Sequence, residues 1–110
     1  MKNHIVSFQQ YAREVRMVRA DSTNLDGARG ITDYNTSRIY IANNLSNITL
    51  KQTLIHELTH AALYDYDHSA DDTTSEINFN NEEELCRLME VAMCEIYEQA
   101  MEIYEDWKRN

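Results

Sequence analysis

Residues 56–60 read His-Glu-Leu-Thr-His, and this pentapeptide constrains the local structure more than any other feature of the chain. Residues four apart in an α-helix lie on the same face, about one turn apart, so His56 and His60 can hold one divalent metal ion between them in a helix. Glu57 follows His56 at about 100° around such a helix. From there its carboxylate can reach a water in the open coordination position of the metal and act as a general base. The motif predicts a metal site on a helix.

The residues that surround the motif favour this interpretation over a chance match. With His56 at 0° on a helical wheel, His60 falls at about 40°, and apolar residues gather near the opposite side. These residues are Leu54, Leu58, Ala61 and Ala62. A chance match is more typical of an exposed polar helix, and histidines and a carboxylate on a buried helix are costly unless they are paired or bind metal. We therefore expect a helix over residues 49–66, with one face in the core and the His/Glu face towards a cleft.

Length and charge limit the classes of protein to consider. The chain has 110 residues, which predicts a single domain over residues 1–110. Its formal net charge of −9 leaves no basic face to neutralise phosphates, so we expect no nucleic-acid partner. No apolar run is long enough to span a bilayer, and the first residues lack the apolar stretch of a signal peptide. We expect no membrane partner and an intracellular, cytoplasmic location.

The two cysteines agree with this location. Cys86 and Cys94 are eight residues apart on a predicted helix, about 12 Å along its axis, which is beyond the reach of a disulfide. The sequence predicts that both are buried core thiols.

The remaining segments predict a mixed α and β structure. Residues 4–20 fit either one helix or two strands, and their β-branched and aromatic apolar residues favour two strands. Residues 21–30 predict a polar loop, residues 30–34 and 38–42 predict a hairpin, and residues 43–47 predict a linker and helix cap. The acid-rich segment from Asp65 to Asn81 predicts a solvated loop. A second helix over residues 81–107 has an apolar stripe of Leu85, Cys86, Met89, Ala92, Met93, Ile96, Ala100, Ile103 and Tyr104.

A catalytic zinc normally has three protein ligands, so a third is needed beside the two histidines. With Met89 at 0° on the second helix, Glu82 falls at about 20°, Glu83 at about 120° and Glu84 at about 220°. Glu82 alone continues the apolar stripe and is the predicted ligand, with Glu83 as the second choice. His68 is a further alternative, but eight residues beyond His60 it is expected past the helix end, as an exposed loop histidine.

These features together resemble a small gluzincin, and the closest resemblance is to the ImmA/IrrE-type metallopeptidases, which are common in phages and mobile elements. The active helix of that family typically reads HELxHA, which residues 56–61 match. The chain differs at Thr59, where the family often has Gly. It also has Leu85 or Cys86 where a small residue usually follows the glutamate ligand. The metzincin pattern is absent, because Leu63 and Tyr66 stand where it requires Gly and His.

The resemblance implies an α+β, zincin-like fold, in which a small antiparallel or mixed sheet packs on the HExxH helix and a long C-terminal glutamate helix. It implies a Zn²⁺-dependent peptidase that acts on a protein or peptide substrate, such as a repressor, with Glu57 as the general base. It also implies that the strand before the metal helix, residues 38–41, pairs with extended substrate.

Two other functions remain as alternatives. One is a zinc-stabilised binding protein without catalytic activity, because 110 residues leave little chain for substrate pockets. The presence of Glu57, which a structural zinc does not need, argues against it. The other is an SprT-like site with His68 as the third ligand, although the basic surface of such proteins is missing.

The length of the second helix raises a question about assembly. It would extend for about 40 Å, more than one small domain needs. Its far end, with Ile103, Tyr104 and Trp107, predicts either a homodimer contact or a segment that folds back over the N-terminal strands.

Overall fold

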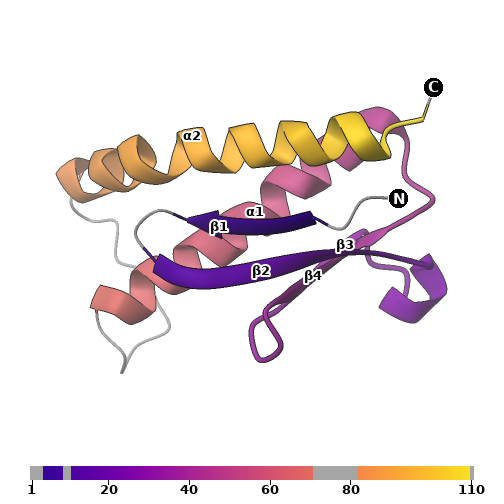
Figure 1. Ribbon diagram of the computed structural model, residues 1–110, viewed down its shortest axis with the longest axis horizontal. Helices are drawn as coiled ribbons and strands as arrows, with labels where there is room; N and C mark the ends of the chain where they lie inside the picture. The colour runs from indigo at the N-terminus through magenta and orange to yellow at the C-terminus, as the bar shows by residue number, and fades with distance from the viewer. Residues whose placement is uncertain (1–3, 9–10, 71–81, 110) are drawn as a thin grey trace.

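The computed structural model describes the backbone of residues 4–8, 11–70 and 82–109, and among these the side chains of 4–8, 14–63, 86, 89, 90 and 92–109. Four strands form one sheet, and two long helices cover one of its faces (Figure 1). The fold is therefore α+β with a small mixed sheet, as the sequence predicts. The elements are β1 (His4–Phe8), β2 (Tyr11–Ala20), η1 (Ser22–Leu25), β3 (Gly30–Asp33), β4 (Arg38–Ala42), α1 (Asn47–Ala70) and α2 (Glu82–Trp107).

The sheet has the strand order β1-β2-β4-β3. β1 pairs with β2, and β3 with β4, in antiparallel fashion, while β2 and β4 are parallel. The two N-terminal strands confirm that prediction over the single helix. In β1, His4, Val6 and Phe8 alternate inwards and Ile5 and Ser7 outwards, which is the period of a half-buried strand.

A short turn joins β3 and β4 and confirms the predicted hairpin. Asp33 ends β3, and its carboxylate accepts hydrogen bonds from the backbone N–H groups of Asn35 and Thr36 at 3.0 and 3.4 Å. A hydrogen bond from the Thr36 side chain, together with these backbone donors and the charge of Arg38, holds the pKa of Asp33 below its ordinary value. An ionised Asp33 therefore stabilises the turn that fixes where β3 ends.

Helix α1 begins at Asn47, two residues before the predicted start, and ends later than predicted. Ser46 caps it, since its hydroxyl accepts a hydrogen bond from the Thr49 N–H at 3.3 Å and its carbonyl accepts one from Leu50 N–H at 2.8 Å. The helix continues to Ala70, so the expected end near Tyr66 is wrong, and Asp65 and Asp67 lie in the helix rather than in a loop. Without proline or glycine in this stretch, nothing in the backbone chemistry ends the helix earlier. The rest of the predicted loop, residues 71–81, lies outside the described residues.

The core lies between the sheet and the two helices. α1 packs on β3 and β4, and α2 packs on β1 and on α1. The fully buried large side chains come from all of these layers: Val6, Ile39, Ile41, Leu50, Leu54, Leu58 and Ile103. The apolar face predicted for the metal helix, Leu54, Leu58, Ala61 and Ala62, is buried in this core.

Helix α2 ends at the predicted Trp107, and among its described side chains the buried members of the predicted stripe lie in the C-terminal half, while Leu85 lies outside the described side chains. Ile96, Ala100, Ile103 and Trp107 are buried, whereas Cys86, Met89 and Met93 are exposed. The prediction of buried thiols is also wrong for Cys94, which is exposed. Among the described residues of α2, the members of the buried core cluster are Ile96, Ala100, Ile103 and Trp107. The helical period of the apolar residues therefore includes positions, at Cys86, Met89 and Met93, that the described core does not cover.

The C-terminal end of α2 folds back on the N-terminal strands. The buried His4 ring contacts Trp107 edge-on and bonds through Nε2 to Asp106 Oδ2 at 2.8 Å. The Arg19 guanidinium lies 5.0 Å from the centre of the Trp107 ring and donates to the Trp107 carbonyl. Ile103 and Trp107 are thus core residues of one protomer. Neither side chain is available for the predicted homodimer contact.

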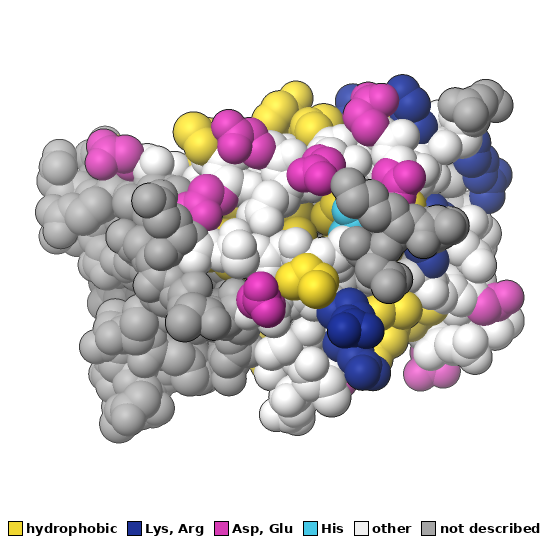
Figure 2. Space-filling view, viewed as in Figure 1, with side chains coloured by type: hydrophobic (Ala, Val, Ile, Leu, Met, Phe, Trp, Pro, Cys, Tyr) yellow, Lys and Arg dark blue, Asp and Glu magenta, His cyan; other side chains and the backbone are white. Residues whose placement is uncertain are grey.

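The exposed surface of α2 carries both acidic and apolar side chains. Figure 2 shows acid side chains spread along α2, with apolar ones between them. Exposed residues of both kinds are present on the helix, among them Met93, Tyr97, Glu98 and Glu102. In the part of the chain that the structure describes, neither helix is long and apolar enough to cross a membrane.

Candidate metal centre

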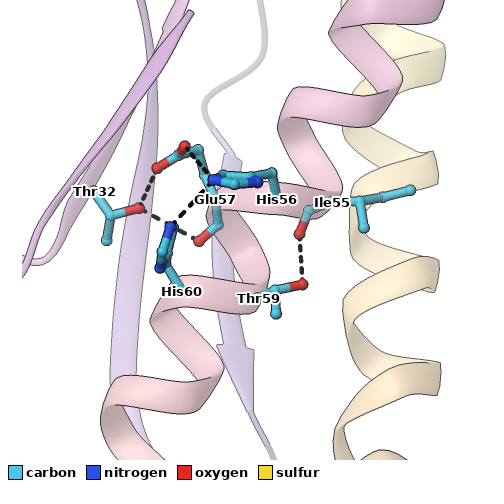
Figure 3. Close-up of polar contacts among 6 residues, drawn as sticks. All are labelled: Thr32, Ile55, His56, Glu57, Thr59 and His60. Carbon is cyan, nitrogen blue, oxygen red and sulfur yellow. Dashed lines mark hydrogen bonds and ion pairs between the residues drawn. The ribbon is translucent and has the colours of Figure 1, made fainter. Parts of the chain in front are cut away.

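Three of the predicted site residues, His56, Glu57 and His60, lie on α1, on the side that faces β3 (Figure 3). The two histidines are exposed, with 67% of the His56 side chain accessible, while the neighbouring Glu57 side chain is only 9% accessible. The face that the sequence predicts to be turned towards a cleft therefore combines two exposed imidazole rings with a nearly buried carboxylate. Glu57 lies between the outer His56/His60 face and the buried Leu54/Leu58 face, so its carboxylate points towards the sheet.

The geometry of the histidine pair fits a bound metal ion. Nε2 of His56 and Nε2 of His60 are 3.2 Å apart, and the two rings are nearly perpendicular, at 78°. Two nitrogen ligands at about 2.05 Å in a tetrahedral zinc site are separated by about 3.3 Å. The two nitrogens therefore already have the separation of neighbouring ligands around one ion.

Glu57 is held by strand β3. The Thr32 hydroxyl donates to Glu57 Oε1 at 2.7 Å and lies 3.4 Å from the Glu57 carbonyl oxygen. The other carboxylate oxygen, Oε2, faces the histidines, 3.8 Å from His56 Nε2 (Figure 3). The carboxylate is therefore directed towards the place where a metal held by both histidines would bind water.

A cavity of about 310 Å³ opens beside these groups. It lies between β3 and α1 and is lined by Arg29, Gly30, Gln52, Thr53, His56 and Glu57. A larger hollow of about 810 Å³ lies on the sheet face away from the helices, against Val18, Ile31 and Tyr40. None of His56, Glu57 and His60 lines that hollow, so the smaller cavity is the one beside the proposed chemistry.

Strand β4 cannot pair with substrate in the way that the resemblance implied. It is an inner strand, bonded to β2 on one side and to β3 on the other, so residues 38–41 have no unpaired edge. Among the described strands, the edge on the site's side belongs to β3. The sequence did not reveal this order, because the long-range pairing of β2 with β4 leaves no local signal.

The third ligand is not determined by the described side chains. Among them, no group of three His, Cys, Asp or Glu residues is placed to hold a metal ion. Glu82, Glu83 and Glu84 form the first turn of α2, as the sequence predicts, but their side chains lie outside the described residues. Measured from the buried Ile96, position 82 lies at about 40° around the helix, position 83 at about 140° and position 84 at about 240°. Since Ala100 is also at about 40°, position 82 remains the one in line with the buried face.

His68 occupies a different place from the one expected. Because α1 continues to Ala70, position 68 is in the helix rather than in a following loop. It lies about 12 Å along the axis from His60 and about 18 Å from His56. This separation argues against one ion bound by all three histidines.

Thr59, where the resembled family often has glycine, fits the helix without disruption. Its hydroxyl donates to the Ile55 carbonyl oxygen at 2.7 Å, on the α2 side of the helix (Figure 3). The hydroxyl therefore has a partner within its own helix and points away from the histidine pair. The helix therefore accommodates this departure from the family pattern.

Two residues of the site, Gly30 and Thr32, were missed by the sequence reasoning. A Cβ atom at Gly30 would meet Glu57 Cγ at 2.9 Å and Thr53 Cγ2 at 3.0 Å. The only sequence signal for either residue is its place in a strand close before the metal helix, and this does not identify which strand residues face Glu57.

Comparison with known families identifies the family of the chain. The model of the IrrE N-terminal-like domain, Peptidase_M78, matches residues 11–94. The chain therefore belongs to this metallopeptidase family, which confirms the resemblance drawn from the HELxHA motif. Comparisons with curated proteins and with solved structures gave no match.

Proposed function

We propose that this protein is a zinc-dependent peptidase, in which His56, His60 and Glu82 hold the metal and Glu57 is the general base. The observation that carries the proposal is the 3.2 Å separation of the two histidine nitrogens, with Glu57 Oε2 beside them at 3.8 Å from His56 Nε2. Membership of a peptidase family supports hydrolysis over a purely structural metal. A structural zinc would also have no use for the carboxylate of Glu57.

The residues of the site divide the chemistry between them. When bound, zinc supplies a Lewis acid that activates water and polarises the substrate carbonyl. Glu57 accepts a proton from the attacking water and returns it to the leaving amine. Its low exposure keeps bulk water from competing for the carboxylate, and the exposed histidines leave the approach to the site open.

Strand β3 is the proposed docking edge for an extended substrate. The Ala42 N–H donates to the Arg29 carbonyl at 2.9 Å, so residues 29 and 42 form a hydrogen-bonded pair. Hydrogen-bonded and non-bonded pairs alternate in an antiparallel ladder, so Gly30 and Thr32 direct their N–H and C=O groups away from β4. A peptide strand added there would lie next to Glu57.

The substrate is proposed to be a specific intracellular protein, such as a repressor, rather than proteins in general. This rests on the resemblance to the ImmA/IrrE-type peptidases. A chain of 110 residues also has little surface for a series of side-chain pockets.

The test compares the zinc-loaded wild type with Glu57→Gln on casein and on a library of peptides, with cleavage read by mass spectrometry. We expect cleavage by the wild type, full zinc content in both proteins, and loss of at least about 100-fold in rate for Glu57→Gln. Glu98→Gln, an exposed glutamate on α2, is the matched control and should cleave like the wild type. Equal inactivity of wild type and Glu57→Gln, with zinc bound in both, would indicate a binding protein instead.

A further inference from the structure

The two oxygens of the Glu57 carboxylate have different surroundings. Oε1 accepts a hydrogen bond from the Thr32 hydroxyl at 2.7 Å, a length typical of a strong O–H···O⁻ bond. Oε2 accepts no bond from Thr32 and faces the histidine pair, 3.8 Å from His56 Nε2. A single side chain on a neighbouring strand therefore distinguishes the two oxygens.

Gly30 restricts the carboxylate from a second direction. The space that a Cβ would fill at position 30 is taken up by Glu57, whose Cγ and Cδ would lie 2.9 and 3.3 Å from that atom. The side chain of Glu57 therefore lies directly on the backbone of β3, with the Thr32 hydroxyl at its end. Rotation of the carboxylate away from this position would break its hydrogen bond from the Thr32 hydroxyl.

We propose that Thr32 is a positioning residue for Glu57, an inference that rests on the proposed peptidase function. Its hydroxyl occupies Oε1 and so leaves Oε2 as the oxygen that takes the proton from water. Thr32 can go on donating to Oε1 after that step, because a protonated carboxyl still has an acceptor oxygen. The proton is thus kept on the side of the carboxyl group that faces the histidines, where the leaving amine needs it.

Thr32 also belongs to the proposed docking edge. Its side chain holds the base, while its backbone N–H and C=O point outwards to the position of the substrate strand. The two roles use different atoms and can be separated. Replacement of the hydroxyl should lower kcat, because the base is less well oriented, and should leave KM unchanged, because the backbone groups remain.

The experiment compares Thr32→Val, which has nearly the same shape without the hydroxyl, with Thr32→Ser, which keeps the hydroxyl. The zinc-loaded proteins are assayed on a peptide that the wild type cleaves. We expect kcat to fall about 10- to 100-fold in Thr32→Val and to return to within about threefold of wild type in Thr32→Ser, with KM unchanged in both. Thr23→Val is the matched control, since it removes a similar 2.8 Å bond from a threonine to Asp21 far from the site.

A second measurement does not depend on activity. Crystal structures of zinc-loaded wild type and Thr32→Val should show the Glu57 carboxylate turned away from its wild-type orientation in the variant. Wild-type kcat in Thr32→Val, or equal losses in the valine and serine variants, would overturn the role of the hydroxyl. If the zinc-loaded wild type cleaves nothing, the proposed function fails, and an unmoved carboxylate in the Thr32→Val crystal would then overturn the positioning role separately.

Discussion

Gly30 and Glu57 are in direct contact, and the contact has no room for one more atom. A Cβ at position 30 would lie 2.9 Å from Glu57 Cγ, closer than carbon atoms in proteins approach each other. The Glu57 side chain, whose carboxylate is the proposed base, therefore packs directly against the backbone of Gly30.

Replacement of Gly30 by alanine should displace Glu57 and lower the cleavage rate at least about tenfold, because a shift of the base by about 1 Å spoils its alignment with water. Overpacking should also cost about 1–3 kcal/mol of stability. Gly27→Ala is the control: Gly27 has a φ of +80° and no neighbour near the added atom, so it should lose stability alone. Chemical denaturation and turnover per bound zinc separate the two effects. Unchanged turnover in Gly30→Ala would contradict the role of this contact.

The three residues of the motif should respond differently to substitution. His56→Ala or His60→Ala should abolish stoichiometric zinc binding, because each removes one of two nitrogens already set 3.2 Å apart. Glu57→Gln should keep the metal, since Glu57 is the proposed base and not a ligand, and the glutamine side chain has the same shape. Elemental analysis of the dialysed proteins measures this. Full zinc content in either histidine variant would rule out the proposed ligand pair.

The glutamate ligand can be tested in the first turn of α2. Glu82→Ala should weaken zinc binding strongly, because a site with two histidines is one ligand short of a catalytic zinc site. Glu84→Ala, about 200° further round the helix, should change neither zinc affinity nor activity. Competition with a chelator gives the affinities. If Glu83→Ala is the variant that loses zinc, Glu83 is the third ligand and the assignment of Glu82 is wrong. The assignment of His56 and His60 as ligands would not change.

Removal of zinc should lower the melting temperature, because ligands on α1 and α2 would no longer be tied together. Zinc at about 1,000 times its dissociation constant stabilises a fold by about 4 kcal/mol. Differential scanning calorimetry with and without EDTA measures the shift. The same EDTA treatment should leave His60→Ala unaffected, since that variant has no metal to lose. An unchanged melting temperature in wild type shown beforehand to contain zinc would exclude the link between the helices.

The contact of Trp107 with the N-terminal strands should contribute strongly to stability. Trp107→Ala would leave a cavity between His4, Arg19 and the core, at a cost of about 3–5 kcal/mol. Tyr97→Ala, an exposed aromatic on the same helix, should cost less than about 0.5 kcal/mol. Urea denaturation of both variants makes the comparison. Similar losses would mean that the contacts of Trp107 carry little of the stability.

The local parts of this fold could be predicted because their signals are local. The spacing of His56 and His60, the cap at Ser46 and the polar turn before Arg38 each fix the structure of a few neighbouring residues. What the sequence did not reveal depends on distant partners. The exposure of Met89 and Met93 depends on which other elements reach that part of α2, and the inner position of β4 follows from its pairing with β2.

The same distinction applies within the site. The motif predicts the two histidines and Glu57, because helix geometry alone sets their relation. Thr32 and Gly30 reach Glu57 from a strand about 25 residues earlier, and only the register of β3 against α1 decides which strand residues face the helix. His4 is a further case, because its ring bonds to Asp106 near the other end of the chain.

The shortness of β3 sets a limit on how tightly any extended peptide can be held there. Of its four residues, Gly30 and Thr32 direct their backbone groups outwards. Each offers one N–H and one C=O, so the edge can form four backbone hydrogen bonds with a peptide. At about 1 kcal/mol net for each bond, such an edge provides about 4 kcal/mol, which corresponds to millimolar affinity. Peptides held by this edge alone would therefore exchange rapidly. The same brevity protects the molecule from growth of sheets between copies, since long edges are the ones that recruit further strands.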